Sequence, residues 1–172
     1  MADDPDFKAD LARYPARPFL REQSIWAICV YRFGRRVFNR KPGVLRNIQL
    51  KFYWLIFRAV ETGTGISLPL EAQIGPGLRI YHFGNIFINP RVVIGRNCTL
   101  RQGVTIGNTG VDGPVPVIED NVQFGAYAQV FGEVRIGQGA KVGAMSVVLC
   151  DVPGGATAFG NPARILPRRP EQ

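Results

Sequence analysis

The sequence predicts a mainly β protein built around a parallel β-helix, and a six-residue period is the main observation behind this prediction. Apolar residues recur at every sixth position of the segment 118–148, as Ile118, Phe124, Val130, Ile136, Val142 and Val148. A helix would repeat its apolar face near every 3.6 residues, and an ordinary strand would repeat it every two. A period of six therefore indicates short extended segments separated by regular corners, which is the hexapeptide signature of a parallel β-helix.

The same period extends upstream and is interrupted once. Ile88, Ile94, Leu100 and Ile106 keep the period, and Ile74, Ile80 and Ile86 keep it two residues out of phase. One coil buries little apolar surface alone, but stacked coils make a continuous core. The alternative is a β-sandwich in which Val and Ile alternate by chance, and so many matches disfavour it. The interruption predicts an extruded loop near 107–117.

The chain divides into three parts by its pattern of residues. We assign 1–63 to an N-terminal helical segment, 64–152 to the β-helix, and 153–172 to a C-terminal cap and tail. Acidic residues around Pro5 predict a short first helix, and apolar residues at helical spacing predict two more, over 19–38 and 44–60. Pro153-Gly154-Gly155 breaks the repeat, so we expect an irregular or short helical cap over the last coil.

Composition restricts the cellular context and the partners. The 172 residues carry a formal net charge of +8, which is typical of a protein with an anionic partner. The basic, amphipathic N-terminal helices have two interpretations: they pack on the β-helix or a neighbouring subunit, or they lie on an anionic inner-membrane surface. Cys29, Cys98 and Cys150 lack metal-binding spacing and no signal peptide opens the chain, so we expect a cytoplasmic protein.

His82 is the single histidine and the first candidate for chemistry. One histidine cannot form a three-histidine zinc site, so no metal is expected. It can act as a general base, because its pKa lies close to working pH. The alternative is a surface histidine without a role. Glycine-rich nucleotide loops and nucleic-acid recognition motifs are absent from the sequence, so no nucleic-acid partner is expected.

Several motifs, which lie in the region 66–165, carry a resemblance to a known family. They are Ile80-Tyr81-His82-Phe83-Gly84, Val104-Thr105-Ile106-Gly107-Asn108, Gly143-Ala144-Met145-Ser146-Val147-Val148, Val152-Pro153 and Gly160-Asn161-Pro162-Ala163-Arg164. With these motifs the chain resembles the hexapeptide-repeat acyltransferases and, within them, the serine acetyltransferase branch. It looks most similar to acetyltransferases of bacterial exopolysaccharide synthesis, of the colanic acid type.

The resemblance implies a left-handed β-helix that forms a homotrimer, with pairing of two trimers left open, and acetyl-CoA in the groove between neighbouring prisms. It also implies that His82 deprotonates an acceptor hydroxyl, which attacks the thioester directly. Ala126 and Ala144 match positions whose backbone contacts the pantetheine arm. From charge and location, we expect Lys141, Arg164 and Arg168 to bind the phosphates; ordinary surface charge is the alternative.

The chain departs from serine acetyltransferases where the acceptor binds. Tyr81, Ser67 and Val115 stand where that branch has two acidic residues and a second histidine. Serine carries an ammonium group that needs a carboxylate partner, so we expect a neutral acceptor instead: a sugar hydroxyl of an exopolysaccharide or its precursor.

The expected acceptor contacts are Tyr81, Phe83, Gln102 and Asp112, and the group that orients His82 is Glu71, Asn85 or Asp112. Two alternatives remain open. One is a serine O-acetyltransferase with altered acceptor contacts, and the other is a non-catalytic β-helix scaffold.

Overall fold

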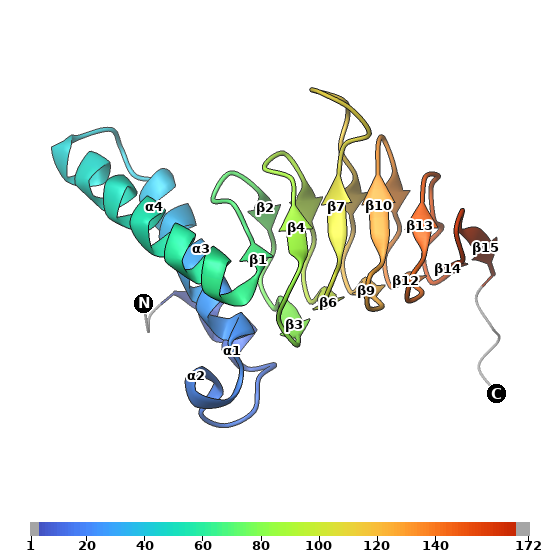
Figure 1. Ribbon diagram of the computed structural model, residues 1–172, viewed down its shortest axis with the longest axis horizontal. Coiled ribbons are helices and arrows are strands. Elements are labelled where there is room, and N and C mark those ends of the chain that lie inside the picture. The colour runs from blue at the N-terminus through green and yellow to red at the C-terminus, as the bar shows by residue number, and fades with distance from the viewer. Residues whose placement is uncertain (1–3, 168–172) are drawn as a thin grey trace.

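The β-helix occupies most of the chain, and four helices lie at its N-terminal end (Figure 1). A computed structural model describes residues 4–167. Three parallel sheets form the faces of the prism. The first contains β1 (Ile66–Ser67), β4 (Ile86–Ile88), β7 (Thr105–Gly107), β10 (Gln129–Phe131) and β13 (Val147–Val148). The second contains β2 (Gln73–Ile74), β5 (Val93–Ile94), β8 (Val117–Ile118) and β11 (Arg135–Ile136).

The third sheet contains β3 (Arg79–Tyr81), β6 (Thr99–Arg101), β9 (Gln123–Phe124), β12 (Lys141–Val142), β14 (Thr157–Phe159) and β15 (Arg164–Leu166). In each sheet the inward residue of one strand lies opposite the inward residue of the next coil. Val130, for example, pairs with Ile106 on one side and Val148 on the other. All three are buried. The predicted fold class, a left-handed parallel β-helix with an N-terminal helical segment, is confirmed.

The interruption of the period is a loop that projects from the prism after β7 (Figure 1). Ile88 and Ile94 are six positions apart, whereas their register partners Ile106 and Ile118 are twelve apart. Six extra residues therefore leave the prism here.

The C-terminal cap differs from the expected irregular or short helical cap. β14 continues the third sheet in parallel with β12, and β15 then turns back antiparallel to β14. Ala156 and Ala158 keep the inward alternation beyond the Pro-Gly-Gly segment and are buried, which explains why the sheet gains one more parallel strand. The hairpin covers the edge of the last coil, so the expected capping role is met by strands.

The helices are α1 (Pro5–Leu11), α2 (Pro18–Arg21), α3 (Ser24–Phe38) and α4 (Val44–Thr64). The single helix predicted over 19–38 is divided, because Glu22 adopts an extended conformation between α2 and α3. α4 runs four residues past its predicted end and stops at Gly65, which has the left-handed φ of 64° that favours glycine. Within residues 4–167, each helix is too short or too polar to cross a bilayer.

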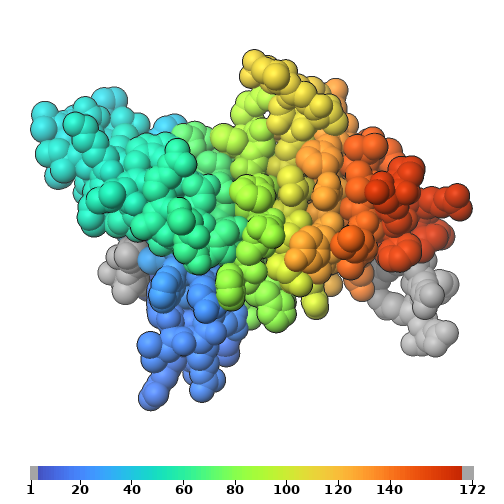
Figure 2. Space-filling model, in the orientation of Figure 1, coloured from blue at the N-terminus to red at the C-terminus, as the bar shows by residue number. Residues whose placement is uncertain are grey.

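α3 and α4 form a hairpin whose tip extends away from the β-helix (Figures 1 and 2). A side chain at Gly34 of α3 would overlap the Tyr53 ring of α4, so the two helices cross closely at this glycine. Tyr53 and Phe57 are buried in this contact. The stripe that the sequence marks on α4 faces the other way: Leu45, Ile48, Phe52 and Leu55 are all exposed. The interpretation that this stripe packs against the chain's own β-helix is therefore wrong.

Buried polar contacts fix the helices to the first coil. Arg32 of α3 donates to both Asp10 carboxylate oxygens, at 2.7 and 3.0 Å, and to the carbonyl of Ile74 at 2.7 Å. The Tyr31 hydroxyl donates to the Ala72 carbonyl at 2.8 Å. Because these groups are buried and satisfied, the helical segment and the coil that carries residue 82 are held in one arrangement.

Candidate active site

His82 lies at a corner of the first coil that is longer than the corner above it. The corner joins β3 to β4, and six positions separate Tyr81 from Phe87; their register partners Arg101 and Thr105 are only four apart. The two extra residues account for the phase shift in the sequence repeat. His82 has a left-handed φ of 67° and an exposed side chain. The longer corner thus carries the imidazole outside the prism, where a substrate can reach it.

The corners above His82 form one edge of the prism, between the third sheet and the first. The Tyr127 amide donates to the Gln102 carbonyl at 2.8 Å, and the Met145 amide donates to the Ala126 carbonyl at 2.9 Å. A Cβ at Gly125 would overlap the backbone of Ala144, so the coils approach closely here. Ala126 and Ala144, the residues predicted to border a pantetheine arm, therefore lie along the same edge as His82.

Two of the three predicted phosphate-binding cations lie at the far end of the third sheet. Lys141 is in β12 and Arg164 is in β15, and both are exposed. Along this sheet β12 is three strand spacings from β3 and β15 is five, or about 14 and 24 Å at ~4.8 Å each. Arg168 lies outside the described residues. The third sheet therefore has the histidine at one end and these two cations toward the other.

A cavity of about 250 Å³ adjoins His82 and is lined partly by the N-terminal helices. Tyr81, His82 and Phe83 form one side of it. The other lining residues are Arg21, Glu22, Gln23, Ser24 and Arg79. The structure thus brings together the predicted residues Tyr81, His82 and Phe83, and it adds a charged segment that the sequence did not connect with them.

An ion pair forms the charged wall of this cavity. Arg79 donates to the two carboxylate oxygens of Glu22 at 2.5 and 2.8 Å. Its guanidinium lies 3.9 Å from the centre of the Tyr14 ring and 4.2 Å from that of Tyr81. Burial alone would lower the pKa of Arg79, but the hydrogen bonds to Glu22 and Tyr14 raise it. Arg79 therefore stays cationic and holds Glu22 at the cavity.

The remaining predicted residues lie apart from the cavity. Gln102 is one coil above His82, and its side-chain oxygen is buried without a partner in the described structure. Asp112 is in the loop after β7, at another corner of the prism. Glu71 is at the corner between β1 and β2. Over residues 4–167 the His82 imidazole makes no hydrogen bond or ion pair, and of the three predicted orienting groups Asn85 alone lies in the same corner as His82.

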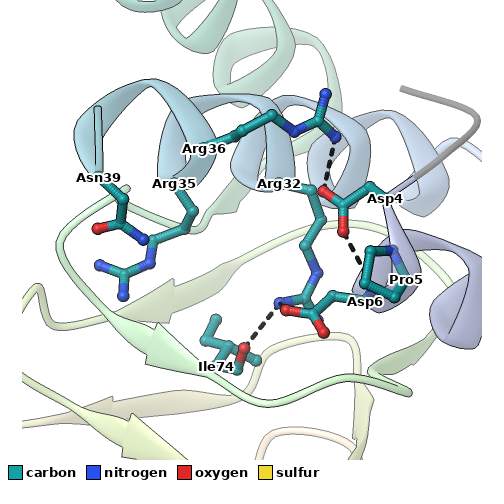
Figure 3. A pocket seen from close by; sticks show the side chains of 8 residues that line it. All are labelled: Asp4, Pro5, Asp6, Arg32, Arg35, Arg36, Asn39 and Ile74. Atoms are coloured by element: carbon teal, nitrogen blue, oxygen red, sulfur yellow. Dashed lines mark hydrogen bonds and ion pairs between the residues drawn. The ribbon is translucent and has the colours of Figure 1, made fainter. Parts of the chain in front are cut away.

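A larger cavity, about 530 Å³, lies between the start of α1 and the face of α3 (Figure 3). Three arginines line it, but each is bonded to the protein: Arg32 to Asp10, Arg35 to the Leu70 carbonyl, and Arg36 to Asp4. Burial opposes ionisation of Asp4, yet the hydrogen bond from Arg36 lowers its pKa. Two of these charges are thus paired with acids and the third donates to a carbonyl, and the predicted base His82 is not among the lining residues. We therefore interpret this cavity as a structural junction and place the candidate site at His82.

The comparisons with known proteins identify the class to which this fold and site belong. No family model matches the sequence. Serine acetyltransferase of Bacillus licheniformis is 35% identical over 157 residues, which cover 90% of this chain and 69% of that protein. Serine acetyltransferase of Synechococcus elongatus is 38% identical over 107 residues, which cover 61% of this chain and 44% of that protein. The chain spans about half the length of the first curated relatives that it matches.

Solved structures agree with the sequence relatives. The Neisseria gonorrhoeae serine acetyltransferase bound to serine has a TM-score of 0.78 at 30% identity, over 94% of this chain and 66% of that one. A serine acetyltransferase bound to CoA has a TM-score of 0.77 at 31% identity, with the same two coverages. The β-helix and its site thus define a hexapeptide-repeat acetyltransferase. In particular, the chain belongs to the serine acetyltransferase family.

These relatives correct the expected acceptor. The absence of acidic residues at Tyr81 and Ser67 favoured a sugar hydroxyl, and the resemblance to exopolysaccharide acetyltransferases favoured it further. The matches are instead to serine acetyltransferases, in sequence and in structure. The sugar interpretation is therefore wrong. Its physical flaw is that it considered acids only within the β-helix, whereas the structure brings the carboxylate of Glu22 to the cavity from the helical segment.

Proposed function

We propose that this protein is a serine O-acetyltransferase that uses acetyl-CoA and has altered acceptor contacts. The observation that carries the proposal is the exposed His82, at the end of a prism edge that continues past Ala126 and Ala144, in a member of this family. Family membership supports the reaction class, and the CoA complex of a relative supports the acetyl donor.

In the proposed reaction, the His82 imidazole accepts the proton of the serine hydroxyl. The serine oxygen then bonds to the carbonyl carbon of the acetyl thioester while the carbon–sulfur bond breaks. The proton passes from His82 to the departing sulfur, which gives O-acetylserine and free CoA thiol. Backbone amides of the corner are the available donors for the negative charge that develops on the carbonyl oxygen.

The prism edge has features that suit a long, anionic acetyl carrier. The small residues Ala126 and Ala144 leave room for a pantetheine arm, and the close approach of coils at Gly125 keeps the edge shallow. Lys141 and Arg164 provide positive charge for phosphates about 14 and 24 Å from β3, the strand that precedes His82, at ~4.8 Å per strand. CoA bound along this edge would present its acetyl group to His82.

The cavity beside His82 has charges of both signs, as a zwitterionic acceptor requires. Glu22 accepts one hydrogen bond from Arg79 on each carboxylate oxygen, and its remaining lone pairs would accept from the serine ammonium group. Arg21 is a cationic partner for the serine carboxylate. At about 250 Å³ the cavity is smaller than the roughly 300 Å³ at which drug-sized ligand sites begin, so it suits a small amino acid. Tyr81 and Phe83 would border the bound serine, whereas Gln102 lies one coil above the cavity.

A homotrimer is part of this proposal. Several large apolar residues on the outside of the β-helix are exposed in the single chain, which supports burial against neighbouring copies. They are Phe87, Tyr127, Met145, Leu149 and Phe159. Pairing of two trimers extends the same proposal.

Release of CoA thiol from acetyl-CoA in the presence of serine tests the function. We expect kcat/KM to fall by about two or more orders of magnitude in His82→Ala, because the base is lost, while CoA binding measured by calorimetry is retained. Asn121→Ala is the matched control, since Asn121 has a similar left-handed φ of 62° at another corner. An active His82→Ala enzyme would contradict the proposal, and a protein that binds no CoA would support the scaffold alternative.

The same assay tests the acceptor contacts. Arg21→Gln should raise KM for serine and leave that for ethanolamine, which lacks the carboxylate, nearly unchanged. Arg17→Gln removes an equivalent exposed charge that does not line the cavity, so it should change neither value. A protein that binds CoA but releases no thiol with serine would reject serine as the acceptor.

A further inference from the structure

The net positive charge of the protein is concentrated in one segment. Residues 23–60 contain eight Lys and Arg residues and no Asp or Glu. The other 13 basic residues are matched in number by the 13 acidic ones, so this segment alone accounts for the formal charge of +8. It comprises α3, the turn after it and most of α4. Arg32 and Arg36 are paired with Asp10 and Asp4 near α1, and the other six cations leave the helical hairpin positively charged.

The same hairpin exposes a continuous apolar stripe. On α4, Ile48, Phe52 and Leu55 are 59%, 54% and 70% exposed. Spacings of three and four residues place them on one face of the helix, together with Val44 and Leu45. The opposite face contains the buried Tyr53 and Phe57, so the stripe points away from the protein. An exposed apolar stripe of this kind marks an interaction surface.

Exposed cations border the stripe and the tip of the hairpin. Lys51 and Arg58 lie one helical turn before and after Leu55 and are exposed, and Arg40 and Lys41 lie in the turn before α4. Arg58 has an acidic neighbour, Glu61, at 3.7 Å. The charges are thus placed where they would meet anionic groups when the stripe is buried.

We infer that the exposed face of α4 docks on an anionic lipid bilayer, with the stripe in the interface and the cations against acidic headgroups. A helix with an apolar face flanked by Lys and Arg has the design of an interfacial anchor. A second copy is a poorer occupant, because two such faces would bring Arg40, Lys41 and Lys51 of each copy together, and Glu61 beside Arg58 is the one acidic residue that α4 offers against them. A nucleic acid would satisfy the cations but leave the apolar stripe without a partner.

The anchor would also position the active site. α3 packs against α4 and is bonded through Tyr31 and Arg32 to the first coil, and residues of α2 and α3 line the cavity beside His82. Docking through α4 would therefore hold the first coil and its cavity near the lipid surface. The inference itself does not depend on the acceptor or on catalysis.

Flotation of the full chain with vesicles tests the inference. We expect binding to vesicles of phosphatidylcholine mixed with phosphatidylglycerol at about 50 mM salt, and weaker binding at about 500 mM, because the contact is partly electrostatic. Binding to phosphatidylcholine alone should be at least about tenfold weaker. Lys51→Gln should weaken anionic-vesicle binding about fivefold, the effect of about one kcal/mol per cation near a charged surface.

Matched variants distinguish binding through the stripe from non-specific hydrophobic adhesion and from the effects of misfolding. Leu55→Ser should weaken vesicle binding about tenfold, whereas Val111→Ser, on the exposed loop, should not change it. Arg96→Gln, an exposed cation on the β-helix, is the control for Lys51→Gln. Circular dichroism and CoA binding should be unchanged in all four variants. Failure of the vesicle test would therefore leave the proposed acetyltransferase function intact, and the reverse also holds.

Three outcomes would overturn the inference. One is failure of the native chain to float with anionic vesicles at low salt. Another is equal binding by the Leu55→Ser variant and the native chain, which would remove the stripe from the contact. The third is a smaller oligomer in light scattering for Leu55→Ser, because the stripe would then be covered by a second copy.

Discussion

The β-helix and the α3–α4 hairpin both display apolar periodicity, but the periodicity has different meanings in the two regions. In the β-helix every inward residue has a partner at a fixed offset, as Val130 has Ile106 and Val148. In the hairpin the most regular stripe, which contains Phe52 and Leu55, faces outward. In the β-helix an apolar repeat identifies a buried face, because the next coil packs against it. In a helix the repeat shows only that one face is apolar, and it does not show what packs against that face.

The largest expected effect comes from replacing a phenylalanine by alanine in each of the two regions and comparing the losses of stability. Phe124→Ala should lower the free energy of unfolding by about 4 kcal/mol, because Phe124 is fully buried between coils and the deletion leaves a cavity. Phe52→Ala on the α4 stripe should cost less than about 1 kcal/mol. Urea denaturation followed by circular dichroism measures both. Equal losses would mean that α4 already buries its stripe in the native assembly.

The same contrast explains what the sequence could predict. The β-helix was predictable because so many in-phase matches to a six-residue period disfavour a β-sandwich. The phase shift at Ile86 corresponds to the longer corner that exposes His82. The ion pair of Arg79 with Glu22 was not predictable, because 57 positions separate the two residues and only the docking of the helices brings them together. The outward orientation of the α4 stripe was not predictable either. An amphipathic pattern marks an apolar face but does not show whether that face packs on the protein or remains exposed.

The junction between the two regions supplies the next prediction. Asp10→Ala should lower the free energy of unfolding by about 3 kcal/mol, because it leaves the buried charge of Arg32 and the Leu78 amide without their partner. Asp6→Ala is the matched control: its carboxylate is half exposed and 3.8 Å from Arg32, so its loss should cost about 0.5 kcal/mol or less. Guanidinium denaturation of the two variants gives the comparison. If Asp10→Ala were as mild as the control, the helices would not depend on this pair for their position.

The smallest effect is a pH dependence that belongs to the β-helix. Burial raises the pKa of the Cys98 thiol from an ordinary value of 9.0 to about 11. Because the folded-state pKa lies above the unfolded value, the thiol stabilises the fold fully below pH 9, and this contribution is lost as pH rises through 11. The loss by pH 11 should be about 2 kcal/mol, somewhat less than the full value of the raised pKa, because the folded-state thiol is only half ionised at that pH. Urea denaturation from pH 8 to 11 of the native chain and of Cys98→Ala isolates the effect, since the variant lacks the thiol but keeps the other groups.

The variant should show a flatter pH profile, and Cys150→Ala, at an exposed corner, should keep the native profile. Parallel profiles for native protein and Cys98→Ala would mean that the coil at Cys98 opens to water before the chain unfolds.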